Sequence, residues 1–280
     1  MPLTPPALEA LPRFDPIFVT QEDLEDLATF FGMTHKECLD RLRQYSMREM
    51  ADAWRRADPQ TPDQILDFYR KTDLYIWELM QWHASAARIP CWQALARLAD
   101  RYLPAAGYLR VYDFGCGVGT DGLFLASRGY EVTLVDVDGP AFRFATHRFR
   151  RRGLAASFQV SCSPNPEPGG VYDVVVCFDV FEHLPDPLNA ARRLVAAMRI
   201  GGLLVQRGAF EDSGDHPCHL HDGVERFGGL RWHIHLTGLG LRPDGPLAYR
   251  KAEGLTWLTQ KCRYAIWRRT SVWINYVRPA

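Results

Sequence analysis

The sequence predicts an α/β protein with a doubly wound parallel sheet that is preceded by a region of helices. From about residue 108, short β-branched runs alternate with helical stretches, as expected of parallel strands joined by crossover helices. A glycine-rich turn follows the first of these runs, and helix-capping patterns occupy the preceding region. With 280 residues and 47% hydrophobic content, the chain can bury the core of one such domain and a smaller appendage.

The first hundred residues are predicted to form several short helices. Thr20 with Asp23 and Thr34 with Glu37 have the spacing of capping-box pairs, which satisfy free backbone N–H groups at a helix start. Apolar residues over 65–80 then recur at the spacing of one helix face. We therefore expect a set of helices that packs onto the sheet.

Short apolar and β-branched runs mark the strands of the sheet. We place these strands near 109–114, 131–136, 157–160, 172–178 and 203–208. Helices are expected between them near 120–128, 140–152 and 187–199, the last one stopped by Gly201-Gly202. The C-terminal part is predicted to hold a helix near 224–239, a strand near 247–250, a Trp-rich basic helix over 252–268 and a final strand over 271–277.

Charge and cysteine usage limit the classes of partner and compartment. Thirty-three basic residues balance 33 acidic ones, so no overall field attracts a nucleic acid or an anionic membrane. The seven cysteines lack the paired spacing of a zinc site and the even count of a disulfide framework. We find neither a basic start followed by an apolar stretch nor a long uncharged apolar run. We expect a cytoplasmic protein that binds neither nucleic acid nor membrane.

A glycine-rich turn follows the first predicted strand and precedes a helix. Gly115, Gly117 and Gly119 let the backbone turn sharply and approach a ligand that any side chain would push away. Asp113 stands two residues before the first glycine. Asp136 closes the next strand, where a carboxylate can accept both hydroxyl groups of a ribose. Together these residues predict a site for a nucleoside-containing cofactor.

A nicotinamide-dependent oxidoreductase is the main alternative, because its dinucleotide site uses a similar turn and acid. In that fingerprint the third glycine comes three positions after the second, and an apolar residue takes the place of Asp113. Here the glycines are two positions apart. The carboxylate of Asp113 also suits an ammonium group better than a pyrophosphate. An NAD(P)-dependent enzyme is therefore the second choice.

Three motifs occur in order along the sheet region: D-x-G-x-G-x-G over 113–119, V-T-L-V-D-V-D over 132–138 and Y-D-V-V-V-C-F-D-V-F-E-H-L over 172–184. They resemble the motifs of class I S-adenosylmethionine-dependent methyltransferases. The resemblance implies a Rossmann-like, seven-stranded, mostly parallel sheet with S-adenosylmethionine as the cofactor. It also implies methyl transfer to an oxygen or nitrogen of a small-molecule metabolite. A non-catalytic relative that binds the cofactor or a partner is a further alternative.

The resemblance covers roughly residues 109–208 and leaves the first hundred residues unexplained. We therefore divide the chain into an N-terminal helical cap over 1–104 and an S-adenosylmethionine-binding methyltransferase domain over 105–280. The expected partner is a small-molecule methyl acceptor, and whether the protein forms a homodimer is left open.

The resemblance also implies roles for individual residues. The glycines of the turn would line the methionine and ribose side of the cofactor, Asp113 would help hold its amino group, and Asp136 would bind the ribose hydroxyls. The residues predicted to bind the cofactor are Asp113, Gly115, Cys116, Gly117, Gly119, Asp136, Val137, Cys162, Phe178 and Asp179. The acidic residue that often contacts adenine in this family is missing after the third strand, where a hydroxyl, a backbone carbonyl or Glu167 could replace it.

Histidines gather where the carboxyl edge of the sheet is expected. Methyl transfer needs alignment, exclusion of water and a base that keeps an oxygen or nitrogen nucleophile deprotonated. The candidate bases are His183, His216, His219 and His221. His183 could instead cap the helix that starts near residue 187.

The histidines after the fifth strand allow a second interpretation. Together with Asp215 they could bind a divalent metal that orients an oxygen nucleophile. The compact H-x-x-H-x-H spacing and the resemblance favour a base, so no metal is predicted. Three aromatic residues of the helical cap are candidate substrate contacts, namely Tyr69, Tyr75 and Trp82.

Overall fold

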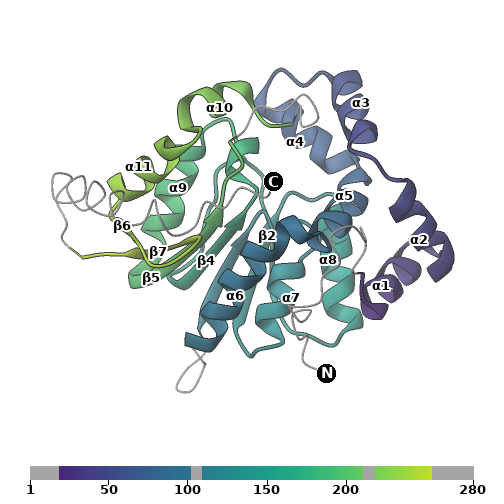
Figure 1. The fold of residues 1–280 in the computed structure, drawn as a ribbon, viewed down its shortest axis with the longest axis horizontal. Helices are drawn as coiled ribbons and strands as arrows, with labels where there is room; N and C mark the ends of the chain where they lie inside the picture. The colour runs from purple at the N-terminus through teal and green to yellow at the C-terminus, as the bar shows by residue number, and fades with distance from the viewer. Residues whose placement is uncertain (1–18, 102–108, 211–217, 254–280) are drawn as a thin grey trace.

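The computed structural model describes residues 19–101, 109–210 and 218–253, without the side chains of His221 and Asp222. Its strands form one seven-stranded sheet in the order β3-β2-β1-β4-β5-β7-β6 (Figure 1). The strands are β1 (Arg110–Phe114), β2 (Glu131–Asp136), β3 (Ser157–Val160), β4 (Tyr172–Phe178), β5 (Met198–Arg207), β6 (Leu241–Pro243) and β7 (Ala248–Lys251). Strands β1 to β5 pair in parallel, and β7 runs antiparallel to β5 and β6. The predicted mostly parallel, seven-stranded sheet is confirmed.

Helices cover both faces of the sheet. One face packs against α6 (Ile89–Arg101), α7 (Thr120–Ala126) and α8 (Pro140–Arg151), and the other against α9 (Pro187–Ala196), α10 (His221–Phe227) and α11 (Leu230–Gly238). Figure 1 shows these two groups on opposite sides of the strands. Alternation along a strand explains the two cores, since Val111 faces the first group and Tyr112 the second.

The N-terminal helices form a third core beside the carboxyl ends of the strands. They are α1 (Gln21–Phe31), α2 (His35–Gln44), α3 (Met47–Ala57), α4 (Pro62–Lys71) and α5 (Leu74–His83), followed by the short 3₁₀ helix η1 (Ala86–Arg88). The capping boxes at Thr20 and Thr34 are confirmed. This core also takes in Val118 and Phe144 of the sheet domain. The predicted boundary at residue 104 between a helical cap and a methyltransferase domain stays a prediction. Helix α6 lies before this boundary, and its buried residues pack in the core of the sheet.

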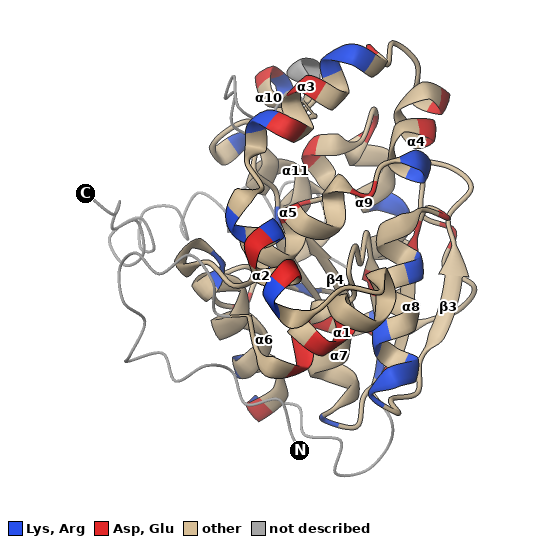
Figure 2. Cartoon of the chain, turned by 90° about the vertical axis from the view of Figure 1, so that its right-hand side faces the viewer, with Lys and Arg blue, Asp and Glu red and all other residues tan. Residues whose placement is uncertain are grey.

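Buried ion pairs join α1 to α8. The carboxylate of Asp26 is fully buried and accepts hydrogen bonds from Arg148 (3.0 Å, Nε to Oδ2), Arg151 and Arg152 (2.9 Å, Nε to Oδ2). Figure 2 shows acidic residues of α1 close to basic residues of α8. A shared carboxylate among three arginines therefore holds the helical cap on the sheet domain.

The predicted helix stop at Gly201-Gly202 is wrong. Helix α9 already ends at Ala196, and β5 starts at Met198. The β4–β5 pairing steps from Tyr172–Met198 to Val174–Leu203, so the intervening residues bulge out of the ladder. Gly201 has a φ of +79° in this bulge, which is why glycine is found there.

The C-terminal part departs from prediction at two further places. The helix expected over 224–239 is interrupted after Phe227, because Gly229 adopts a φ of +61° between α10 and α11. Strand β6 was not predicted, since three residues give too little pattern. The helix over 252–268 and the strand over 271–277 lie outside the described residues, apart from positions 252 and 253.

The described residues bear on two expectations from the sequence, namely that the cysteines form no disulfides and that no helix crosses a membrane. The six cysteines in the described ranges are all free thiols. Within those same ranges, every helix is too short or too polar to cross a bilayer. The cytoplasmic location stays a prediction.

Candidate active site

A cavity with an empty volume of about 1100 Å³, counting its part open to solvent, lies at the carboxyl ends of β1, β2 and β4. This is where the strand order reverses between β1 and β4, and such points carry ligand sites in open α/β sheets. The helices α4 and α5 add Tyr69, Tyr75 and Trp82 to its lining. The three aromatic candidates therefore line the same space as the predicted cofactor motif.

The glycine turn forms part of the cavity wall. Gly115 and Gly117 adopt φ values of +69° and +53°, a left-handed conformation that glycine reaches at no steric cost. A Cβ on Gly115 would lie 2.4 Å from Cγ2 of Val180, and one on Gly117 would lie 2.5 Å from Cδ1 of Leu79. Both positions thus need glycine for two reasons: the turn has a left-handed conformation there, and neighbouring side chains, including one from α5, pack closely against the backbone.

Asp136 lies at the end of β2 and faces the cavity. Its Oδ2 accepts from the backbone N–H of Gly117 and its Oδ1 from that of Val137, both at 2.7 Å. Burial raises the pKa of Asp136 to about 6, although these two N–H groups favour the carboxylate. The carboxylate is fixed in place and retains lone pairs for a ligand with hydroxyl groups.

A buried arginine from the helical cap lies between two carboxylates at the cavity. Arg88 is 2% exposed, donates to Asp121, and donates from Nη1 to Oδ2 of Asp179 at 3.2 Å. Trp82 also donates to Oδ2 of Asp179, at 3.1 Å. Among the described residues, Oδ1 of Asp121, Oδ1 of Asp179 and Nε of Arg88 are buried without a hydrogen-bond partner. A ligand with both ammonium and carboxylate groups would satisfy these atoms.

The strand end that carries Asp179 is locally constrained. This residue has a φ of +55°, which is uncommon for a residue other than glycine. Its backbone N–H donates to the carbonyl oxygen of Arg207 at 2.8 Å, and the side chain of Arg207 lies 3.4 Å from its Oδ1. The neighbouring strand therefore holds the carboxylate of Asp179 at the cavity.

The structure divides the predicted cofactor residues into two groups. Those that line the cavity are Gly115, Cys116, Gly117, Asp136, Val137, Phe178 and Asp179. Asp113, Gly119 and Cys162 are not part of the lining. Asp113 is 3% exposed and lies behind α7, where a Cβ on Gly122 would be 3.2 Å from its Oδ2. The carboxylates that reach the cavity at this end are those of Asp121 and Asp179.

The other two residues are displaced for different reasons. Gly119 starts α7 with a φ of +73°, and a Cβ there would lie 3.0 Å from the Cβ of Ala145, so this glycine allows α7 to pack closely on α8. Cys162 is exposed, while Ser161 and Ser163 on either side of it line the cavity. Of the substitutes considered for adenine recognition, these hydroxyl-bearing residues are the ones at the cavity.

His183 is the candidate base that lines the cavity. Its Nδ1 lies 3.0 Å from the carbonyl oxygen of Cys218 and 3.3 Å from the hydroxyl of Tyr69. Because a carbonyl oxygen only accepts, Nδ1 carries the proton and Nε2 has the lone pair. The imidazole is therefore oriented by the loop after β5.

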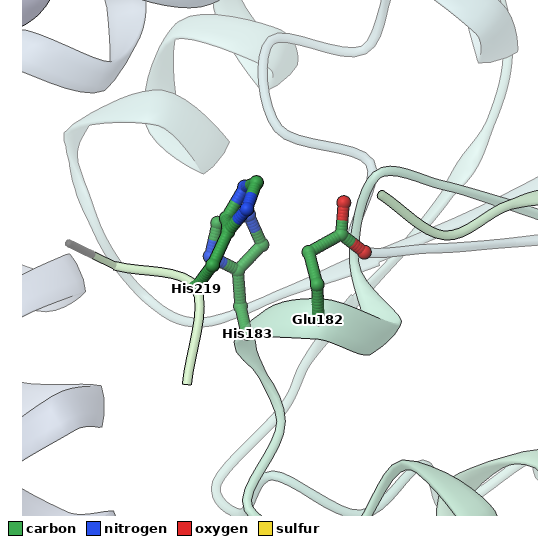
Figure 3. Close-up of side chains that lie close together, drawn as sticks. All are labelled: Glu182, His183 and His219. Carbon is green, nitrogen blue, oxygen red and sulfur yellow. The ribbon is translucent and has the colours of Figure 1, made fainter. Parts of the chain in front are cut away.

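Two further side chains lie beside His183 (Figure 3). The ring of His219 is 5.0 Å from the His183 ring, centroid to centroid. Glu182 is 1% exposed, and its Oε1 accepts from the backbone N–H of Ala209 at 3.0 Å. Burial raises the pKa of Glu182 to about 8, with the charge of Asp179 adding to the effect.

The remaining histidine candidates are not placed at the cavity. His216 and Asp215 lie outside the described residues, and the side chain of His221 is not described. The metal interpretation based on the loop alone therefore stays untested, and the structure brings His219 next to Glu182 and His183 instead.

Sequence reasoning missed Arg88 and Asp121 as residues of the site. Asp121 could have been found, because it is an acid in the first turn after the glycine motif. Arg88 had no such signal, since it lies 33 residues before its partner Asp121 and in a different element.

Comparisons with known proteins agree with this geometry. A family model described as a methyltransferase domain matches residues 112–204. The ubiquinone biosynthesis O-methyltransferase of Bordetella avium is 33% identical over 99 residues, which are 33% of this chain and 39% of that protein. The protein of the same name from Xanthomonas axonopodis pv. citri is 30% identical over 112 residues, which are 39% of this chain and 46% of that protein.

Residues 112–204 contain the glycine turn, Asp136 and the β4 motif that surround the cavity. The part of the chain around the cavity is therefore similar to a methyltransferase domain. The chain spans about two fifths of the length of the curated relatives it matches. Among solved structures, CalS10, an amino pentose methyltransferase from Micromonospora echinaspora, matches with a TM-score of 0.35 and 24% identity, covering 41% of this chain and 50% of that one.

The residues of the methyltransferase domain fit S-adenosylmethionine. Asp136 would present its carboxylate to the two ribose hydroxyls, because it lines the cavity beside the glycine turn. The buried Oδ1 atoms of Asp121 and Asp179, which accept no hydrogen bond from the described residues, would suit the ammonium group of the methionine part, and Arg88 would suit its carboxylate. The ammonium and carboxylate groups of the cofactor thus both have a complementary side chain at the cavity.

Proposed function

We propose that this protein transfers the methyl group of S-adenosylmethionine to an oxygen or nitrogen of a small-molecule acceptor. The observation that supports it is that one cavity joins the cofactor-binding residues to an aromatic wall. Tyr69, Tyr75 and Trp82 line the same cavity as the glycine turn, so an acceptor held by them would lie close to the cofactor. Balanced charge over the chain favours a small molecule over a nucleic acid.

In this reaction the protein mainly has to position the cofactor and the acceptor. When bound, S-adenosylmethionine supplies a methyl group that is already activated by its sulfonium. Asp136, Arg88, Asp121 and Asp179 would orient it by hydrogen bonds and ion pairs. The aromatic wall would exclude water from the reacting atoms. His183 could accept the acceptor's proton at Nε2.

Calorimetric titration with S-adenosylmethionine, S-adenosylhomocysteine and NAD tests this proposal. We expect both sulfur-containing ligands to bind and NAD to fail. A methyl-labelled cofactor, incubated with a panel of phenols, catechols and amines, then reports transfer. Binding of NAD alone would overturn the proposal in favour of an oxidoreductase. Cofactor binding without transfer to any class of acceptor would indicate a non-catalytic relative.

The affinity for S-adenosylhomocysteine is expected to fall as the pH drops below about 6. The raised pKa of Asp136 means that its carboxyl is protonated below about 6 in the free protein, whereas two ribose hydroxyls need an ionised acceptor. Each pH unit below 6 should cost up to about tenfold in affinity. Calorimetry between pH 5 and pH 8 measures this.

The control separates this effect from acid unfolding. A carboxyl whose pKa is raised on folding adds stability as it takes up its proton, so the contribution of Asp136 to stability grows between pH 6 and pH 4. Asp136→Asn should bind more weakly and lose this part of the pH dependence. An unchanged pH profile in that variant would show that another group is responsible.

A further inference from the structure

We infer that Glu182, His183 and His219 bind a divalent transition-metal ion, such as Zn²⁺, which holds the oxygen of the methyl acceptor. One ligand atom from each of these residues lies within 4.8 Å of the other two. Two imidazole nitrogens and one carboxylate oxygen match a known catalytic zinc ligand set with an open coordination position. The inference rests on the proposed function, and it narrows the acceptor to an oxygen compound.

The three residues come from two elements that the fold brings together. Glu182 and His183 lie in the short 3₁₀ helix η2 (Phe181–His183) after β4, and His219 lies in the loop after β5. The backbone N–H of Leu220 donates to the carbonyl oxygen of Glu182 at 3.0 Å, which ties the loop to η2. Figure 3 shows the three side chains extending toward the same side.

The groups around these side chains support metal binding. A metal-binding histidine usually donates its other N–H to a carbonyl or carboxylate, which fixes the ring. His183 meets this condition, because its Nδ1 lies 3.0 Å from the carbonyl oxygen of Cys218. Its Nε2 is then the nitrogen with the lone pair.

Glu182 provides the second, independent observation. Its side chain is 1% exposed, and Oε1 is held by the backbone N–H of Ala209. Its Oε2 is buried and has no hydrogen-bond partner among the described residues. An unpartnered buried carboxylate oxygen is costly, and a cation next to the two histidines would remove that cost. Metal–ligand distances of about 2.1 Å in a tetrahedral site put the ligand atoms about 3.4 Å apart, so atoms that are now up to 4.8 Å apart must approach one another by up to about 1.4 Å.

The position of the ion assigns its role. His183 lines the cavity, so an ion bound to it has its open coordination position toward the acceptor. A hydroxyl bound to the ion loses its proton to solvent water more readily. The oxygen then forms a bond to the methyl carbon, and the carbon–sulfur bond breaks with its electron pair going to sulfur. The products are a methyl ether and S-adenosylhomocysteine.

An acceptor with two adjacent oxygens would suit this site best, because both could bind the ion. In the metal-bound protein the ion, and not the imidazole of His183, activates the hydroxyl. The two roles make different predictions for metal removal, since a histidine base works without an ion.

The test is titration of chelator-treated protein with Zn²⁺, Mn²⁺ and Mg²⁺, followed by calorimetry or competition with a chromophoric chelator. We expect one Zn²⁺ per chain, bound more tightly than Mg²⁺. His219→Ala should weaken Zn²⁺ binding by more than about tenfold, and Glu182→Gln should do the same. His235→Ala, whose ring contacts Phe227 on α10, is the matched control and should leave binding unchanged.

Binding of S-adenosylhomocysteine, measured on the same samples, separates the two proposals. Cofactor binding without stoichiometric Zn²⁺ or Mn²⁺ binding would overturn the metal site and leave the methyltransferase proposal standing. Equal metal affinity in wild type and His219→Ala would also overturn it. A catechol methylation rate that is lost with the chelator and restored by Zn²⁺ would support it, and a rate unaffected by the chelator would not.

Discussion

Replacing Asp26 with alanine is expected to lower the free energy of unfolding by about 3–5 kcal/mol, because it leaves buried arginines without their shared carboxylate. The side chain of Arg148 is 1% exposed and that of Arg152 is 7% exposed. Asp23 stays as a partner at 2.6 Å from Arg148 and 2.7 Å from Arg152, but it cannot neutralise both. The loss therefore leaves uncompensated charge between α1 and α8.

Urea denaturation followed by circular dichroism measures this loss. Asp67→Ala is the matched control, since Asp67 pairs with Lys71 on the surface of α4 at 2.6 Å and both side chains are at least half exposed. That variant should lose less than about 1 kcal/mol. Equal losses in the two variants would show that the Asp26 cluster contributes no more than a surface pair.

The same variant should also weaken cofactor binding. Arg148 donates to the carbonyl oxygen of Val118 at 2.7 Å and to the hydroxyl of Thr120 at 2.8 Å. Both acceptors lie next to Gly119, at the end of the glycine turn. The ion-pair cluster thus connects the helical cap to the backbone that approaches the cofactor.

Replacing Asp136 with alanine is expected to lower the affinity for S-adenosylhomocysteine about 100-fold. Each hydrogen bond from a hydroxyl to a charged acceptor contributes about 1.5 kcal/mol, and the loss of two of them corresponds to roughly two powers of ten in Kd. The variant also removes the acceptor for the backbone N–H groups of Gly117 and Val137. The glycine turn should therefore be less fixed as well.

Calorimetric titration of wild type, Asp136→Ala and Asp138→Ala measures this effect. Asp138 lies two residues further on, has a 63% exposed side chain, and pairs with Arg143 at 3.2 Å. Its replacement should leave the affinity within about twofold of wild type. A ligand without the two ribose hydroxyls should bind wild type and Asp136→Ala alike. If wild type still binds this ligand more tightly than Asp136→Ala does, Asp136 contributes to affinity through something other than the ribose hydroxyls.

These two variants separate the parts of the site. Asp26 acts by holding the helical cap on the sheet domain, so its loss should affect the free energy of unfolding more than the affinity for the cofactor. Asp136 acts at the ligand, so its loss should appear mainly in binding. In the free protein, the loss of the buried carboxylate and the loss of the acceptor for two backbone N–H groups act in opposite directions on stability. Both variants should bind the cofactor more weakly, but the large decrease in the free energy of unfolding is expected for the Asp26 variant alone.

The sequence by itself determined the sheet, its glycine turn and the position of Asp136. These features depend on local rules, because strand alternation, a left-handed turn and a helix start leave their pattern within a few residues. The family motifs over 113–184 also imply the cofactor. Strands β2, β3 and β4 match the predicted bounds for the same reason.

The tertiary structure alone decided which side chains meet. Arg88 reaches Asp121 and Asp179 across 33 and 91 residues, and Tyr69 reaches His183 across 114. The same holds for Glu182, which has a carboxylate oxygen within 4.8 Å of a ring nitrogen of His219, a residue of the loop after β5. Asp113 is the opposite case: it belongs to an intact sequence motif, but α7 covers its side chain and keeps it from the cavity. Local patterns fix backbone conformation, but the direction and neighbours of a side chain depend on how distant elements pack.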